Sequence, residues 1–109
     1  MTIALPIKGF TYRFSLSPDS PHVSCVRLCG RCNQRLMAAD WDETHDVCIR
    51  CRRCGAEYFY DSIVSANESS QAAAVVQALE MALFRQPSMD EPSALSIAIA
   101  ARDATPVRD

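Results

Sequence analysis

Apolar and polar residues alternate along the first part of the chain. Between residues 8 and 17, single polar residues separate four aromatic or aliphatic ones, namely Phe10, Tyr12, Phe14 and Leu16. A period of two is typical of a strand with one buried face. The stretch that follows, residues 17–21, has the sequence Ser-Pro-Asp-Ser-Pro and breaks the pattern as a turn. We therefore expect an N-terminal strand and turn over residues 1–22.

A helical period replaces this alternation in the second half of the chain. Between residues 65 and 86, apolar residues recur every three or four positions, namely Ala72, Val75, Val76, Leu79, Ala82 and Leu83. This spacing places them on one face of a helix. Ser65 and Glu68 fit a capping box at the start of the helix, with Ser70 as an alternative N-cap. The face over residues 72–83 is either a core face or the seam of a homodimer.

Pro87 ends this helix, and the segment after it carries two signals. Alternating apolar residues between positions 88 and 103 are typical of a strand, namely Leu95, Ile97 and Ile99. The high alanine content of the same segment is typical of a helix, and Pro92 suits the first turn. We therefore expect a second helix here and a frayed tail over residues 105–109.

Two C-x-x-C units carry the strongest chemical signal: Cys29 with Cys32, and Cys51 with Cys54. A tight turn across each unit puts two thiolates on one side of a knuckle, and two knuckles brought together close a tetrahedral four-thiolate shell. Gly55 suits the second turn because glycine accepts a positive φ. Zinc is the default metal, and iron in a rubredoxin-like site is the alternative. A closed shell leaves no position for water, so we expect one structural Zn²⁺ and no metal-assisted catalysis.

Short β-prone stretches surround the cysteine pairs. They cover residues 23–28 and 47–50, and a further strand is expected at residues 58–64. Residues 37–46 read as the arm and tip of a β-hairpin between the two cysteine pairs. The pattern predicts a small α+β fold in which a four-cysteine zinc ribbon, built of β-hairpins with two knuckles, is joined to an N-terminal strand and one or two C-terminal helices.

The predicted elements divide the chain into consecutive parts. The N-terminal strand and turn occupy residues 1–22, and the zinc ribbon occupies residues 23–64. A helical segment over residues 65–104 packs on the ribbon, and residues 105–109 form the tail. At 109 residues the chain is expected to form one compact domain with a thin core, to which a metal site would add stability.

Two cysteines and two histidines remain outside the four-cysteine set. Cys25 and Cys48 lie in β-prone stretches, where the simplest interpretation is a small buried hydrophobe. The alternatives are a second metal site, alternative ligation or a redox pair. His45, at the expected hairpin tip, could replace a thiolate but is more often solvated, and His22 is a weaker ligand candidate still.

Composition points to a reducing compartment. Apolar residues make up 49% of the chain, which argues against a wholly disordered protein. Met1 is followed by neither a charged n-region nor an apolar h-region, so no signal peptide is expected, and no apolar stretch is long enough to span a bilayer.

We expect the protein to be cytoplasmic. Disulfides are rare in the cytoplasm, and paired cysteines there bind metal instead. No Gly-rich phosphate loop or catalytic triad is recognisable, so no enzyme activity is expected.

The cysteine segment is also rich in arginine. It carries six Arg against four carboxylates between Cys25 and Cys54, although eight carboxylates and three Arg follow from residue 55 on and the formal net charge is -2. Because the thiolates point inward, knuckle side chains point outward, where guanidinium groups can bind phosphate and an aromatic ring can stack on a base. The residues expected to contact nucleic acid are Arg31, Arg35, Arg50, Arg52, Arg53 and Tyr58. Alternatively, the arginines only offset the negative charge of the zinc–thiolate site, and Tyr58, Phe59 and Trp41 form a small core.

A family resemblance supports the first alternative. Residues 26–40 read VRLCGRCNQRLMAAD and residues 48–54 read CIRCRRC. This combination resembles the zinc-ribbon Com proteins of Mu-like phages and prophages over about residues 26–60. The founding member of that family is a translational activator that binds a phage messenger RNA. The resemblance implies that Cys29, Cys32, Cys51 and Cys54 ligate zinc. The N-terminal strand and the helical half have no counterpart in it.

The sequence therefore predicts a small regulatory zinc-ribbon protein of phage type that binds nucleic acid through its arginine-rich knuckles, with RNA favoured over DNA. The alternative is a protein-binding module, such as a phage-encoded inhibitor or adaptor of a host machine. The acidic second half of the chain and the amphipathic stretch at residues 72–83 favour this alternative. A third hypothesis is a redox or metal-handling protein that uses Cys25 and Cys48.

Overall fold

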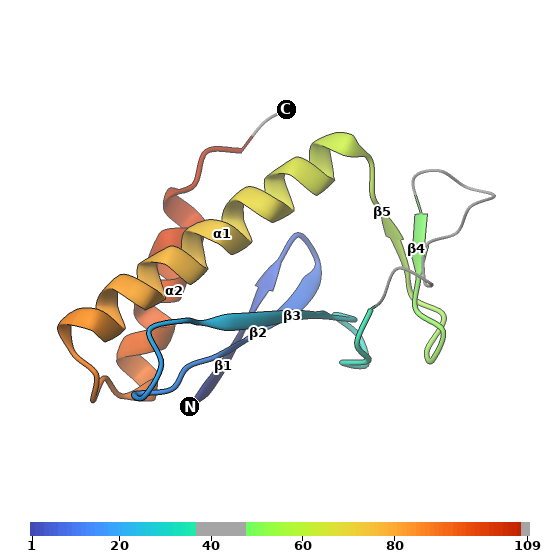
Figure 1. Cartoon of the computed structure of the whole chain (residues 1–109). Helices are drawn as coiled ribbons and strands as arrows, with labels where there is room; N and C mark the ends of the chain where they lie inside the picture. Colours follow the sequence, from blue (N-terminus) through green and yellow to red (C-terminus); the bar gives the residue numbers. More distant parts are fainter. Residues whose placement is uncertain (37–47, 108–109) are drawn as a thin grey trace.

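The fold is a small α+β arrangement, as the sequence predicts. The computed structural model describes residues 1–36 and 48–107. The elements, in chain order, are β1 (Thr2–Ile7), β2 (Phe10–Ser15), β3 (Ser24–Leu28), β4 (Cys48–Arg50), β5 (Glu57–Phe59), α1 (Ser62–Arg85) and α2 (Glu91–Ala104). The three N-terminal strands form one antiparallel sheet, and β4 pairs with β5 in a second (Figure 1). The hairpin arm and tip predicted at residues 37–46 lie outside the described residues.

The N-terminal segment is a hairpin of two strands, so the prediction of a single strand is wrong. Lys8 and Gly9 have φ values of 52° and 87°. Two successive residues with positive φ make the two-residue turn whose twist matches that of an antiparallel pair. The strand expected from residue 8 therefore begins at Phe10, and the residues before the turn form β1, which alternates buried and exposed positions in the same way as β2.

The order of the sheet is β1-β2-β3, with β1 at an edge. Pro6 lies in β1 and has no N–H to donate. An edge strand tolerates this, because it has a neighbouring strand on one side only. β3 pairs with β2 along its whole length, from Thr11 opposite Leu28 to Ser15 opposite Ser24. The strand that the sequence assigns to the ribbon thus belongs to the N-terminal sheet, and it leads directly from this sheet into the first cysteine pair.

Helix α1 begins earlier than predicted. The carboxylate of Asp61 caps it by accepting a hydrogen bond from the N–H of Val64 at 2.8 Å, so neither Ser65 nor Ser70 is the N-cap. Glu68, expected to complete a capping box, instead points into the interior and is 3% exposed. The strand predicted over residues 58–64 therefore ends at Phe59, and residues 62–64 form the first turn of α1 instead.

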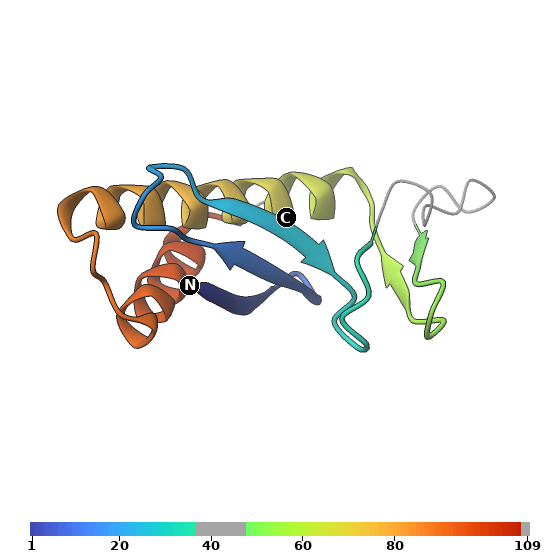
Figure 2. The same cartoon turned by 60° about the horizontal axis from the view of Figure 1, so that its bottom comes forward.

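Helix α2 confirms the helical interpretation of residues 88–103. Asp90 caps it by accepting from the N–H of Ser93 at 2.9 Å, and Pro92 lies in its first turn, where no hydrogen bond is lost. The helix packs against α1 and β1 (Figure 2). Of the helices in the described part of the chain, neither is long and apolar enough to cross a membrane.

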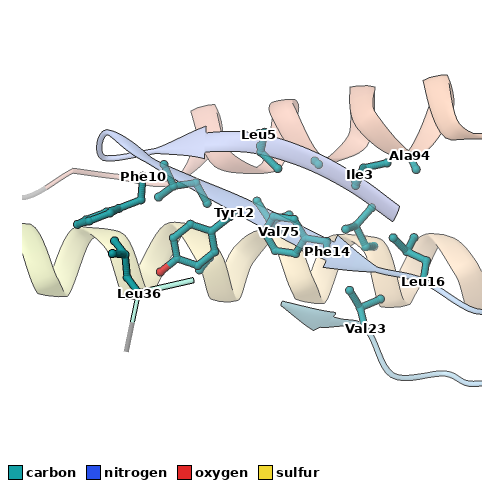
Figure 3. Packing of buried hydrophobic residues seen from close by; sticks show 14 of the residues in the cluster. Ile3, Leu5, Phe10, Tyr12, Phe14, Leu16, Val23, Leu36, Val75 and Ala94 are labelled. Atoms are coloured by element: carbon teal, nitrogen blue, oxygen red, sulfur yellow. The ribbon is translucent and has the colours of Figure 1, made fainter. Parts of the chain in front are cut away.

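The hydrophobic core lies between the sheet and the two helices. One face of the sheet and the apolar face of α1 meet there, where Phe10, Phe14 and Val75 are fully buried (Figure 3). Leu79 of α1 is fully buried as well. Ala94 and Ala98 let α2 approach closely because their side chains are small. The apolar residues predicted at positions 72–83 therefore form a core face of their own chain: Ala72, Val75, Leu79 and Leu83 are all buried in it.

Candidate metal centre

The first cysteine knuckle follows β3 without a break. The N–H of Cys29 donates to the carbonyl of Gln34 at 2.8 Å, and the N–H of Asn33 donates back to the carbonyl of Cys29 at 2.9 Å. Asn33 closes the turn with a φ of 63°. Asparagine tolerates this left-handed conformation better than most residues. These two hydrogen bonds fix Cys29 and Cys32 on the same side of one turn.

The second knuckle, between β4 and β5, repeats the first. The N–H of Cys51 donates to the carbonyl of Ala56 at 2.9 Å, and the N–H of Gly55 donates to the carbonyl of Cys51 at 2.9 Å. Gly55 has a φ of 76°, as the sequence predicts for this turn. It occupies the position that Asn33 occupies in the first knuckle, directly after the second cysteine. The two C-x-x-C units thus adopt the same backbone arrangement.

The two knuckles face each other and bring four sulfurs together. The Sγ atoms of Cys29, Cys32, Cys51 and Cys54 all lie within 4.8 Å of one another. Across the site, Cys29 Sγ lies 3.6 Å from Cys54 Sγ, and Cys32 Sγ lies 3.5 Å from Cys51 Sγ. A Zn–S bond of about 2.3 Å would place tetrahedral sulfurs about 3.8 Å apart. The donor set therefore fits a four-thiolate metal ion and is compatible with structural zinc.

The two cysteines of the first knuckle differ in their surroundings. Burial raises the pKa of Cys29, but hydrogen bonds from the Tyr58 hydroxyl and the Arg31 N–H outweigh burial and lower the pKa to about 6. A backbone bond from Gln34 lowers the pKa of Cys32, but burial and hydrogen bonds shared with the other three thiols raise it to about 12. Because ligation needs all four thiolates, metal binding releases protons, and the affinity for metal falls as the pH falls.

Tyr58 supports the site from β5. Its hydroxyl accepts from the N–H of Gly30 at 2.8 Å and lies 3.0 Å from Cys29 Sγ, to which it donates. Burial and this bond to Cys29 raise the pKa of Tyr58 to about 12, so the hydroxyl keeps the proton that it donates. Its ring packs on that of Phe10, with centroids 4.5 Å apart. The residue predicted to stack on bases thus joins both knuckles to the sheet.

Loss of the Tyr58 hydroxyl is expected to weaken metal binding without unfolding the chain. In Tyr58→Phe the ring still packs on Phe10, but Cys29 loses a donor that holds its thiolate. Groups in contact with metal ligands typically contribute 10–100-fold to affinity, and we expect a loss in this range in a chelator competition assay. Ser15→Ala removes an exposed hydroxyl at the end of β2 that lies opposite Ser24, away from the knuckles, and should leave the affinity unchanged. Equal affinity of both variants and wild type would contradict the role of Tyr58.

Close backbone packing fixes the first knuckle against the β1–β2 turn. A Cβ atom at Gly30 would collide with the carbonyl oxygen of Gly9. Because no side chain can enter this contact, only glycine fits at position 30. The requirement is steric, since the φ of Gly30 is not positive. The metal site is therefore anchored to the N-terminal sheet at Gly30 as well as through Tyr58.

A buried charged network connects this anchor to helix α1. Arg27, two residues before Cys29, donates to Glu68 Oε1 at 3.0 Å and to the Tyr60 hydroxyl at 3.2 Å. The Tyr60 hydroxyl in turn donates to Glu68 Oε1 at 2.6 Å. The Arg27 guanidinium lies 5.0 Å from the ring centroid of Phe10, within cation–π distance. Burial alone would lower the pKa of Arg27, but the charge of Glu68 raises it, so Arg27 stays charged.

The arginines predicted to bind nucleic acid are all exposed. Side chains exposed at or beside the knuckle turns belong to Arg31, Arg35, Arg52 and Arg53. Arg50 is also exposed, in β4, and pairs with Glu57 across the ladder at 2.7 Å. Arg27, which also flanks the first knuckle, belongs to the buried network. The expectation that arginines crowd the outer surface of the knuckles thus agrees with the placement of the exposed residues.

The leftover cysteines lie outside the four-sulfur cluster. Cys25 is exposed in β3, so the interpretation of Cys25 as a buried hydrophobe is wrong, and Cys48 is half-buried in β4. The first faces Phe14 in the β2–β3 register, and the second faces Phe59 in the β4–β5 register. His22 is exposed, its Nδ1 lies 3.7 Å from Glu80 Oε2, and it is not part of the four-sulfur cluster. His45 and Trp41 lie outside the described residues.

Comparison of the chain with protein-family models, curated proteins and solved structures finds no match. The Com resemblance over residues 26–60 therefore stays a prediction from the sequence. What can be stated is a small α+β protein whose four clustered cysteines are positioned to hold a metal ion.

Proposed function

We propose that the protein is a small zinc-ribbon regulator, of phage or prophage type, that binds nucleic acid, with RNA favoured, through its arginine-rich knuckles. The observation that carries this proposal is the exposure of Arg31, Arg52 and Arg53 on the two turns that the cysteine cluster holds. Each of these side chains projects from a turn whose backbone is fixed at both ends. No catalytic step and no membrane are part of the proposed function.

The rigidity of the knuckles supports this function energetically. A guanidinium on a flexible loop loses conformational entropy when it binds a phosphate, whereas one on a metal-fixed turn has lost much of its backbone freedom already. Guanidinium groups also match phosphate geometry with two parallel hydrogen bonds. A four-thiolate zinc site carries a net negative charge, which the same arginines offset. The same arginines can bind phosphate and offset the charge of the metal site. Only phosphate binding predicts that their removal weakens the affinity for nucleic acid.

Replacement of Arg52 and Arg53 together by Ala is expected to weaken nucleic-acid binding and to flatten its dependence on salt. Each phosphate contact to a single strand contributes about 0.7 to the slope of log affinity against log salt, so the slope should decrease by roughly 1 to 1.5. Fluorescence anisotropy with labelled RNA and DNA at several salt concentrations measures both quantities. Arg13→Ala with Arg85→Ala, an exposed pair outside the ribbon, is the matched control.

Two other outcomes of this experiment would count against the proposed function. If the Arg52→Ala, Arg53→Ala variant binds as wild type does, the arginines serve only to offset the charge of the metal site. If wild type binds neither RNA nor DNA, the nucleic-acid function is wrong.

A protein-binding function is the second proposal, because α1 exposes large apolar side chains far from the metal centre. Phe84 is 86% exposed and Met81 is 51% exposed near the end of the helix. Two open depressions are both lined in part by Phe84 and Pro21. Exposed apolar patches of this kind often mark contacts with other proteins. Recovery of a stoichiometric host protein in a nuclease-treated pull-down, lost in Phe84→Ala, would favour this function.

A further inference from the structure

The paired strands β4 and β5 present two chemically different faces. Ile49 and Tyr58 lie opposite each other in the ladder and point to the interior, where Ile49 is 2% exposed. Because successive side chains alternate, Arg50, Glu57 and Phe59 lie on the other face. Phe59 is 65% exposed there. The unit thus supports the metal centre with one face and displays an aromatic ring with the other.

Within the described part of the chain, Phe59 is not among the residues that pack against the hydrophobic core. The aromatic contacts that hold the ribbon to the sheet are made by the residues on either side of it, Tyr58 and Tyr60, whose rings both pack on Phe10. A phenylalanine with two thirds of its surface in water gives up most of the free energy that burial would provide. Its exposure on a short, rigid strand pair is therefore the feature of this face that stability leaves unexplained.

The segment that carries this ring is rich in arginine. The segment from Cys48 to Phe59 holds three arginines and one carboxylate, Glu57. Phe59 and Arg50 are diagonal neighbours on the same face, since Phe59 stands opposite Cys48 and Glu57 stands opposite Arg50. The 2.7 Å contact with Glu57 keeps the guanidinium of Arg50 on this face. Beyond Arg50 the strand enters the knuckle turn that carries Arg52 and Arg53.

We propose that Phe59 is the base-stacking residue of this surface and that the ligand is a single-stranded nucleic acid with an unpaired base. An exposed ring next to guanidinium groups suits a base and its flanking phosphates together. In a duplex the faces of the bases are covered by their neighbours, so only an unpaired base can stack on Phe59. This inference rests on the proposed nucleic-acid function, but it assigns the stacking role to Phe59 in place of Tyr58, whose hydroxyl and ring are engaged by Cys29 and Phe10.

The test compares three variants on a labelled mixed-sequence RNA strand and on the same strand annealed to its complement, by anisotropy. Phe59→Ala should bind the single strand about tenfold more weakly than wild type, in line with the loss of one stacked base, with its salt dependence unchanged. Phe59→Trp should retain the affinity of wild type. Phe84→Ala, which removes the more exposed phenylalanine on α1, is the matched control and should bind normally. A parallel series with DNA shows whether the sugar matters.

Each outcome decides something separate. If Phe59→Ala binds the single strand as tightly as wild type while the Arg52→Ala, Arg53→Ala variant binds weakly, stacking by Phe59 is wrong and the nucleic-acid function stands. If wild type prefers the duplex, the assignment of a single-stranded ligand is wrong. If wild type binds no nucleic acid, the proposed function and this inference both fall. Equal zinc content in all variants, measured by native mass spectrometry, excludes unfolding as the cause of a loss.

Discussion

Removal of the metal by a chelator is expected to unfold β4, β5 and the second cysteine knuckle and to leave the helices folded. β4 and β5 have three residues each. A two-stranded unit of this size is not stable by itself in water. Metal binding to structural four-ligand sites is worth roughly 10–16 kcal/mol in small zinc domains, so its loss removes the main stabilisation of this part of the chain.

The remainder of the molecule has a core that does not depend on the metal. Phe14, Val75, Leu79 and Ala94 are 0% exposed and lie between the sheet and the helices. Hydrogen exchange with and without a chelator tests the difference. We expect the amides of Cys51 and Gly55 to lose protection, while those near Val75 and Leu79 keep it. If α1 loses protection together with the second knuckle, metal binding and formation of the core are one cooperative event.

The second large effect is expected from Arg27→Ala. The substitution leaves the carboxylate of Glu68 buried without its charged partner, and Glu68 is 3% exposed with an Oε2 atom that already has no hydrogen bond. Removal of one partner from a buried ion pair typically costs 3–5 kcal/mol. We therefore expect a decrease of roughly 3 kcal/mol or more in the free energy of unfolding. Urea denaturation of the zinc-loaded protein measures it.

Two further variants show whether the burial of charge is the cause. Arg27→Met with Glu68→Leu replaces both partners by apolar residues of similar size and should recover most of the stability, because no lone charge stays buried. Arg50→Ala breaks the exposed pair with Glu57, whose side chains are 55% and 57% exposed, and should cost less than about 1 kcal/mol. An Arg27→Ala variant that is as stable as Arg50→Ala would contradict this account of the network.

The cysteine knuckles were predictable because their structure is local. The spacing of a C-x-x-C unit and the residue after it determine the turn, and Gly55 is a direct sign of a positive φ. Asn33 occupies the matching position of the first knuckle, and its role as the left-handed residue could have been predicted from that correspondence. The signal for β1 was also present, since Ile3, Leu5 and Ile7 alternate before a Lys8–Gly9 turn.

Other features depend on contacts between distant parts of the chain. Asp61, Ser65 and Ser70 are all acceptable N-caps, and local propensity does not choose among them. Asp61 is the N-cap in the fold. Glu68 cannot complete a capping box at Ser65, because it accepts a hydrogen bond from Arg27, which lies 41 residues earlier in the chain. The partial burial of Arg27, among arginines that are otherwise exposed at the knuckles, has the same origin.

We expect Cys29, Cys32, Cys51 and Cys54, which are positioned to hold a metal ion, to bind zinc. Native mass spectrometry of the reduced protein, before and after alkylation of accessible thiols, tests this expectation most directly. Cys32 and Cys54 are the informative residues because they are only half-buried, so their protection must come from the metal. We expect one zinc ion per chain, with the exposed Cys25 alkylated and all four ligands protected until a chelator is added. A chain that takes up no zinc, or in which Cys32 and Cys54 react as readily as Cys25 with zinc present, would contradict this expectation.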